Sequence, residues 1–209
     1  MQAQLRMKPG DPLIDLRYDD IIRSPYLFGQ FTEATIIDSK LREPIRAAIN
    51  FNGLTGLFEG EINGELHELD ATYYAKITFD STTLNPAYHP KFMSQPVEFL
   101  KGVIPNQFDQ LFIVVHLGMD VNIFKSFEVE IVEHKIEEVK RVTERKRFNP
   151  DFVYFAVSNG EVTRFQLHRK NVLSILRNKD VSTYVKSNKI SLDSEADLKR
   201  VMDYFESVN

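Results

Sequence analysis

Apolar positions near the end of the chain recur with the period of an α-helix. One stripe follows the spacing i, i+3, i+4, i+7 and i+10, and it consists of Leu198, Val201, Met202, Phe205 and Val208. This spacing is typical of an amphipathic helix of about four turns. Two shorter stripes precede it, at 172–176 and 181–185. Narrow apolar stripes have to be buried, so the pattern predicts helices that pack on a sheet formed by the rest of the chain.

The residues just before the last stripe are typical of a helix start. Asp193 or Ser194 can cap the first turn, because a short polar side chain accepts hydrogen bonds from the free N–H groups there. Glu195 and Asp197 follow, where the helix dipole favours negative charge. We therefore expect the last helix to begin at about residue 194.

Upstream of the stripes the apolar period changes to two. Alternation is clear over 45–51 and again over 126–131, which is the pattern of half-buried strands. Three Asn-Gly pairs, at 52–53, 63–64 and 159–160, offer the residues with positive φ that tight hairpins use. We expect an α+β fold, in which an antiparallel β meander forms a curved sheet or partly closed barrel and the C-terminal helices pack on it.

The domain organisation follows from where regular patterns begin. Residues 1–30 are broken by Pro9, Gly10, Pro12 and Pro25, so we predict an irregular N-terminal arm, anchored by the apolar segment 26–28. Residues 31–209 are predicted to form a single α+β domain, with strands mainly over 31–167 and helices over 168–209. A chain of 209 residues is long enough for such a core.

The composition of the chain argues against several classes of function. The formal net charge is −4, which does not favour a nucleic-acid partner. No apolar run is long enough for a transmembrane segment. The chain has no cysteine, which excludes thiol nucleophiles, thiolate metal sites and disulfides together.

Motifs for catalysis or for cofactors are missing from the sequence. The five histidines form no HxH or HExxH pair, and there is neither a Gly-x-Ser-x-Gly elbow nor a glycine-rich phosphate loop. We predict no catalytic, cofactor-binding or metal-binding residue and no cofactor. His116 lies within an apolar run and is predicted to be a hydrogen-bonded histidine of the core or of a strand edge.

Two charged clusters have a functional and a structural interpretation. Asp15, Asp19 and Asp20 could hold a cation, but they lack the spacing of a calcium loop, so a solvated arm is the favoured interpretation. The basic run 145–147, with Lys140-Arg141 before it, could contact nucleic acid. Acidic residues precede the run and Phe148 is the only aromatic residue close to it, so we interpret it as a polar connector between strands.

The best candidate for a binding surface is the long aperiodic stretch 81–96. It contains Tyr88, His89, Phe92 and Met93 between three prolines. Loops of this length in compact domains are often functional. The alternative is a packed connector whose aromatic side chains fill the core.

The order of these features resembles a family of uncharacterised exported proteins of Gram-negative bacteria. The resemblance lies in Ser24-Pro25-Tyr26-Leu27, in the meander 31–79, in the hairpin 151–167 and in the helical segment 172–205 with Asn188-Lys189-Ile190-Ser191-Leu192. It implies a periplasmic or secreted protein and supplies no activity or substrate. The start Gln2-Ala3-Gln4 is similar to the residues around a signal cleavage point, although a native cytoplasmic start stays open.

Three functions remain open at this point. The first is a non-enzymatic envelope or secreted protein that binds a protein partner. The second is a module that holds a small apolar ligand inside a curved sheet. The third is a hydrolase with an unrecognised site. An exposed apolar patch would favour the first, an aromatic-lined cavity the second, and a cleft with histidine and carboxylates the third.

Overall fold

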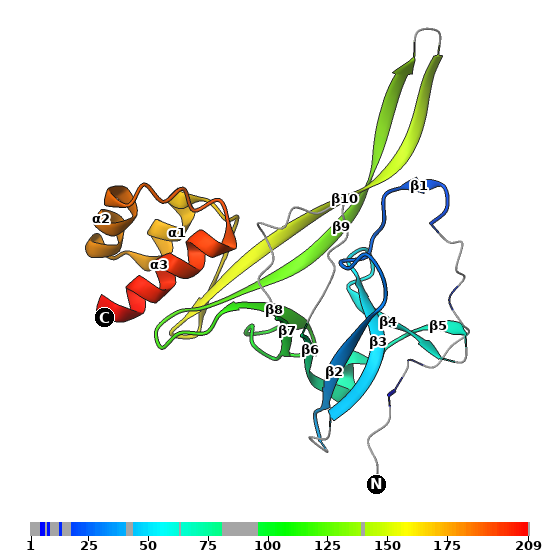
Figure 1. Cartoon of the computed structure of the whole chain (residues 1–209), viewed down its shortest axis with the longest axis horizontal. Coiled ribbons are helices and arrows are strands. Elements are labelled where there is room, and N and C mark those ends of the chain that lie inside the picture. Colours follow the sequence, from blue (N-terminus) through cyan, green and yellow to red (C-terminus); the bar gives the residue numbers. More distant parts are fainter. Residues whose placement is uncertain are drawn as a thin grey trace. The chain divides into compact units, whose positions relative to one another are not determined.

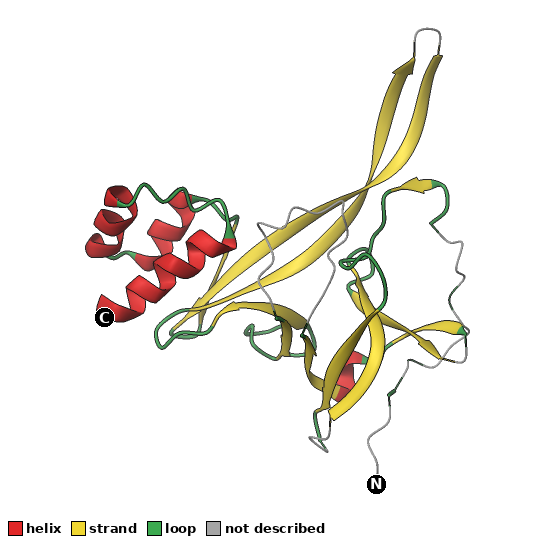
Figure 2. Ribbon diagram, viewed as in Figure 1, coloured by secondary structure: helices red, strands yellow, loops and turns green. Residues whose placement is uncertain are grey.

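A computed structural model describes residues 5–6, 8, 13, 18–40, 44–62, 64–80, 96–138 and 141–208. The candidate binding loop, with Tyr88, His89, Phe92 and Met93, lies outside the described residues. Within them the fold is α+β, as predicted: eleven strands form a mostly antiparallel, open sheet, and three helices follow at the C-terminal end (Figures 1 and 2).

The chain divides into two compact units, which we describe separately. Unit 1 comprises Met1–Tyr88 and Phe127–Asp151, and unit 2 comprises His89–Ser126 and Phe152–Asn209. The long strands β9 (Asn122–Glu138) and β10 (Arg141–Ser158) contribute residues to both units. The sequence predicts a boundary between an N-terminal arm (1–30) and a single domain (31–209). That boundary stays a prediction.

In unit 1 five strands lie in the order β6-β2-β3-β4-β5, and neighbouring strands are antiparallel. Their bounds are β2 (Thr32–Asp38), β3 (Pro44–Asn52), β4 (Leu57–Ile62), β5 (Glu65–Glu68) and β6 (Tyr74–Phe79), with a 3₁₀ turn η1 (Ala71–Tyr73) before β6. The sheet contributes fully buried apolar side chains to the core, among them Ile36, Ile49, Phe58, Ile77 and Phe79. The predicted alternation in β3 holds from Ile45 to Ile49, but Ile49–Asn52 are all buried, so both faces of β3 are covered at that end.

The turn between β3 and β4 forms where the first Asn-Gly pair predicts it, but for a different reason. Gly56, not Gly53, has positive φ, at 72°. A Cβ atom on Gly53 would lie only 2.5 Å from the Phe127 ring and 2.6 Å from Val129. Gly53 is therefore needed because β9 packs directly against this turn, where the Val129 N–H donates to the Gly53 carbonyl at 3.0 Å.

The N-terminal arm is fixed to the sheet by its apolar residues, as predicted. Leu27 and Phe28 are buried, and the Leu27 N–H donates to the Phe51 carbonyl at 2.9 Å. The buried Asn50 amide accepts from the Phe28 N–H at 3.1 Å and donates to its carbonyl at 3.0 Å. A side-chain amide thus satisfies the backbone of Phe28 inside the core.

Described residues of the arm also contact β5 and a buried tyrosine. The Lys8 N–H donates to the Glu68 carbonyl at 2.8 Å. The Tyr74 hydroxyl donates to the Arg6 carbonyl at 2.9 Å and accepts from the Arg6 N–H. Burial raises the pKa of Tyr74 above its ordinary value of 10.0.

This raised pKa predicts a loss of stability at alkaline pH. Above about pH 10 the unfolded chain releases the phenol proton while the folded chain keeps it, so the free energy of unfolding falls as pH rises. Tyr74→Phe should remove the contribution of Tyr74 to this decrease in the free energy of unfolding. At neutral pH it should cost about 0.5–1.5 kcal/mol for the lost hydrogen bond. Urea unfolding of both proteins between pH 8 and 11 measures the effect; equal pH slopes would contradict the prediction.

The rest of unit 1 is a two-stranded ribbon made of the distal parts of β9 and β10 (Figure 1). The short strand β1 (Ile21–Ile22) pairs with β10 in parallel, with Ile21 opposite Lys146 and Ile22 opposite Arg147. β1 therefore brings the N-terminal arm beside a strand that lies more than a hundred residues later in the sequence.

Unit 2 contains β7 (Val97–Lys101), β8 (Leu111–His116), the start of β9, the end of β10 and β11 (Glu161–Phe165). β8 pairs with β7 and β9, and β11 pairs with β10, all antiparallel. A cluster of buried residues forms part of its core, namely Ile104, Phe112, Phe124, Val153 and Phe155. The β10–β11 turn has φ of 51° at Asn159 and 79° at Gly160, which is the hairpin geometry predicted for that Asn-Gly pair.

The helices of unit 2 are α1 (Arg169–Leu176), α2 (Lys179–Ser187) and α3 (Glu195–Val208). Leu198, Val201 and Met202 are fully buried and Phe205 is 5% exposed, but Val208 is 39% exposed. The predicted stripe is therefore the buried face of α3 for all but its last member. α3 contacts both α2 and β8.

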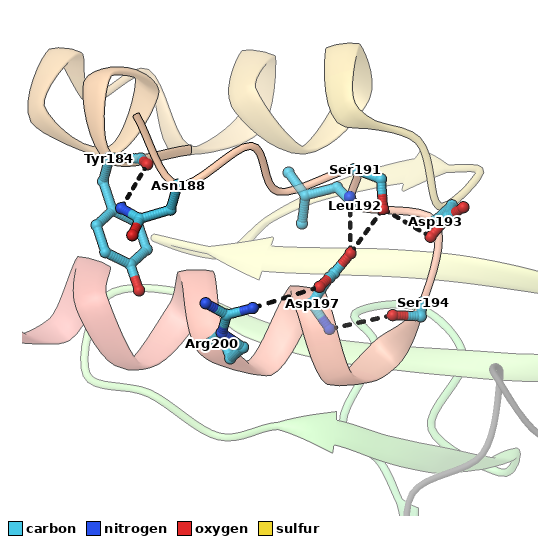
Figure 3. Close-up of polar contacts among 8 residues, drawn as sticks. All are labelled: Tyr184, Asn188, Ser191, Leu192, Asp193, Ser194, Asp197 and Arg200. Carbon is cyan, nitrogen blue, oxygen red and sulfur yellow. Dashed lines mark hydrogen bonds and ion pairs between the residues drawn. The ribbon is translucent and has the colours of Figure 1, made fainter. Parts of the chain in front are cut away.

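Polar contacts fix the segment between α2 and α3 (Figure 3). The Asp197 carboxylate accepts from the Leu192 N–H at 3.2 Å and from the Ser191 hydroxyl at 2.8 Å. The Ser194 hydroxyl accepts from the Asp197 N–H at 3.2 Å, so Ser194 is the predicted cap. Asp197 thus holds the preceding loop against the first turn of α3 instead of only complementing the helix dipole.

Candidate functional site

Three histidines with described side chains lie in separate local settings. His67 lies in β5, His116 ends β8, and His168 caps α1 by accepting from the Lys170 N–H at 3.2 Å. Among the described residues no three His, Cys, Asp or Glu side chains form a group that could hold a metal ion. A site built from several histidines is therefore not found in this part of the chain.

Parts of the two charged clusters noted in the sequence come together in unit 1, whereas Asp15 lies outside the described residues. Asp19 and Asp20 lie in the turn before β1, and Arg145 and Lys146 lie on β10 beside it. These four residues, with Ile21 and Ile22, line an open groove of about 500 Å³. We call it the β1–β10 groove.

Tyr18 positions the acidic wall of the groove. Its ring meets the buried Phe148 of β10 edge-on, with 5.3 Å between ring centroids. Its hydroxyl accepts from the Asn52 amide at 2.9 Å, and its carbonyl accepts from the Ile21 N–H at 3.0 Å. The second of these bonds closes the turn that carries Asp19 and Asp20, so an aromatic anchor holds two carboxylates beside β10.

The electrostatics of the groove are those of a binding surface with charges of both signs. Asp19, Asp20, Arg145 and Lys146 are all exposed. In the part of the chain that the structure describes, none of the four takes part in an ion pair. Ile22 adds an apolar side chain that is 37% exposed. The groove therefore offers two anionic groups, two cationic groups and an apolar contact to a bound molecule.

Both faces of the ribbon are open to solvent at two pairs of positions beside the groove, although Val129 and Phe148 on the same strands are buried. Glu130 and Ile131 are consecutive and both exposed, and so are Arg145 and Lys146. Because consecutive side chains of a strand point to opposite faces, neither face is covered at these positions. A two-stranded ribbon alone is at best marginally stable in water, so this surface is suited to contact with another molecule.

A second polar pair lies in unit 2, at the turn that joins β8 to β9. His116 Nε2 lies 3.6 Å from Glu206 Oε1 of α3, and the two side chains are 12% and 21% exposed. Both atoms are buried, and neither has a hydrogen-bond partner among the described residues. His116 thus lies at a strand end, as predicted, but Nε2 lacks the hydrogen bond that the sequence analysis expected.

The same turn exposes apolar side chains. Leu117 is 56% exposed and Met119 is 83% exposed. Glu206 holds the turn, because its Oε2 accepts from the Met119 N–H at 3.3 Å. A histidine and one carboxylate 3.6 Å apart beside two apolar residues do not by themselves define a reaction, and they lie in the other unit from the groove.

Gly118 is required by the close approach of Glu206 to this turn. A Cβ atom at Gly118 would lie 2.0 Å from Glu206 Oε1 and 2.9 Å from the Val121 carbonyl oxygen. Gly118→Ala should therefore destabilise the protein by about 1–3 kcal/mol, the usual cost of overpacking. Urea unfolding measures this effect. Met119→Ala is the matched control at an exposed neighbour and should change stability by about 0.5 kcal/mol at most. A Gly118→Ala variant as stable as the parent would contradict the geometry.

One ion pair of unit 2 is buried and is therefore not a binding site. The Lys125 ammonium donates to the Glu195 carboxylate, and the Tyr154 hydroxyl donates to the same carboxylate oxygen at 3.0 Å. Lys125 also lies over the Phe152 ring, 4.7 Å from its centroid. Burial lowers the pKa of Lys125, and the charge of Glu195 opposes that effect. Lys125 and Glu195 are almost wholly buried, so a ligand cannot reach them.

No family model, curated protein or solved structure matches the chain. The resemblance to exported proteins of Gram-negative bacteria, and the location that it implies, therefore stay predictions. In the described residues no helix has the length and apolar character needed to cross a membrane.

Sequence reasoning found the members of the β1–β10 groove but not the groove. Asp19, Asp20 and the basic run were each noted as clusters. Their proximity depends on the parallel pairing of a two-residue strand with β10, and so short a pairing leaves no periodic signal.

Proposed function

We propose that this chain is a non-enzymatic exported protein that binds a protein partner through the β1–β10 groove. The observation that carries the proposal is that Asp19, Asp20, Arg145 and Lys146 line one groove without ion pairs among the described residues. Charges of both signs around one groove favour a partner with complementary charges, since electrostatic complementarity gives specificity. A polypeptide segment supplies both signs and apolar side chains together.

The shape of the groove supports a polypeptide over a small apolar ligand. Carriers of apolar molecules enclose them in cavities lined mainly by apolar side chains. The β1–β10 groove is open and is lined by four charged residues and two isoleucines. The exposed positions of the ribbon beside the groove add contact surface that a polypeptide can use and that a small molecule would leave unoccupied.

A peptide-display selection tests the proposal. Random linear dodecapeptides are selected on the immobilised protein, and enriched peptides are synthesised and measured by calorimetry. We expect them to carry both acidic and basic residues. Asp19→Asn/Asp20→Asn and Arg145→Gln/Lys146→Gln should each weaken binding by about tenfold or more, which is about 1.4 kcal/mol.

The matched control removes one charge of each sign from an exposed surface of unit 2. Lys199→Gln/Asp203→Asn changes two exposed residues of α3 and should leave the affinity within about twofold. Failure to enrich any peptide would overturn the proposal. So would peptides whose affinity is the same for the parent and for both groove variants.

Export is tested on the natural gene. The full-length gene is expressed in its host, cells are fractionated, and the N-terminus of the protein is sequenced. A processed protein in the periplasm or the medium is the expected result. An unprocessed chain in the cytosol would refute export and leave the binding proposal to its own test.

A further inference from the structure

The edge of β10 in unit 1 is only partly covered. β1 ends the strand order of the sheet, has two residues and pairs with β10 only at Lys146 and Arg147. β9 occupies the other edge of β10. Among the described strands of unit 1, none continues the row of β1 along β10 toward Arg145 and the residues before it. Unpaired N–H and C=O groups on such an edge are a template for another strand.

We propose that the partner segment binds as an extended strand that adds to this edge of β10, in line with β1; the inference rests on the proposed function of the β1–β10 groove. Strand addition is a common mode of peptide recognition, in which main-chain hydrogen bonds give affinity and side-chain contacts give specificity. Here the groove would supply the side-chain contacts at the point where the row of β1 stops.

The charges of the groove define the chemistry of the added strand. Arg145 and Lys146 are consecutive, so their side chains point to opposite faces of the ribbon. Ile21 already lies opposite Lys146, so the added strand ends beside Arg145, with Lys146 diagonal to its last residue. Acidic residues are therefore favoured at that end of the partner strand. Asp19 and Asp20 lie in the turn directly before Ile21, at the end of the partner strand nearest Arg145, which favours a lysine or arginine close to those acidic residues. Ile22, which is 37% exposed, favours a β-branched or aromatic residue near it.

Backbone methylation of the selected dodecapeptides tests strand addition. In a strand added to an edge, alternate N–H groups face the sheet and the others face solvent. One series of peptides is N-methylated at odd positions within the binding motif and the other at even positions. We expect one series to lose affinity by about tenfold or more and the other to bind within about threefold of the unmodified peptide.

Hydrogen exchange gives an independent readout on the protein. Binding of an unmodified peptide should slow exchange of backbone amides within the strand segment 141–147. Two series that bind equally well, with unchanged exchange in this segment, would overturn strand addition. If the groove variants still weaken binding in that case, the proposed function stands. If the groove variants have no effect, the proposed function fails, whatever the methylation series show.

Discussion

Glu195→Ala should destabilise the protein by about 3–5 kcal/mol, because it leaves a buried ammonium without its counter-charge. Glu195 accepts from Lys125 and Tyr154 inside unit 2, and both ionic side chains are almost wholly buried. Lys125 also lies over the Phe152 and Tyr154 rings, 4.7 Å and 6.0 Å from their centroids, and ring contacts of this kind replace only a small part of an ion pair. The free energy of unfolding from urea titration at pH 7 measures the loss.

Matched variants separate the charge from the packing. Lys199→Ala removes an exposed residue of the same helix and should change stability by about 0.5 kcal/mol at most. Lys125→Met/Glu195→Met replaces both charges with apolar side chains, and this exchange is often neutral or stabilising by about 1–4 kcal/mol. A double variant that is no more stable than Glu195→Ala would show that the ion pair is not the cause of the loss.

The pH dependence of the Glu195→Ala variant has a definite sign. Burial already lowers the pKa of Lys125 in the parent protein, and Glu195 opposes it. Without Glu195 the folded-state pKa falls further below the unfolded value of 10.5. Between the two pKa values the unfolded chain binds the proton and the folded chain does not, so stability rises with pH up to about 10.5. The variant should therefore recover part of its lost stability as pH is raised.

This buried pair marks the limit of what periodicity could predict. Lys125 lies between Phe124 and Ser126, where a strand pattern gives no reason to place a charge in the core. Glu195 was predicted only as a residue favoured by the helix dipole. The two lie 70 residues apart in the chain, and a contact of that separation leaves no signal in a single sequence.

The elements that were predicted correctly are those with local causes. The buried stripe of α3 follows from its apolar spacing, and the β10–β11 turn follows from the positive φ of Asn159 and Gly160. The β3–β4 turn has both a local and a tertiary cause. Its position was predicted, but Gly53 is required by the side chains of Phe127 and Val129, which lie more than seventy residues away.

Phe205→Ala should lower the stability of the protein by about 3–5 kcal/mol, the usual cost of truncating a buried phenylalanine. Phe205 is 5% exposed and belongs to the face of α3 that includes the fully buried Leu198, Val201 and Met202. Its helix contacts β8 and α2, so a cavity at Phe205 weakens the packing of the helices on the sheet of unit 2. For a chain of this size the loss corresponds to a fall in melting temperature of roughly 6–20 °C.

Val208→Ala is the control for this prediction, because Val208 belongs to the same apolar stripe but is 39% exposed. Its effect should stay below about 1 kcal/mol. Thermal unfolding followed by circular dichroism compares the two variants with the parent. A docking helix would give the opposite pattern, since Phe205→Ala would melt like the parent and weaken only the bound complex. That result would end the bracing role of α3 and make its apolar face, instead of the β1–β10 groove, the first surface to test for a partner.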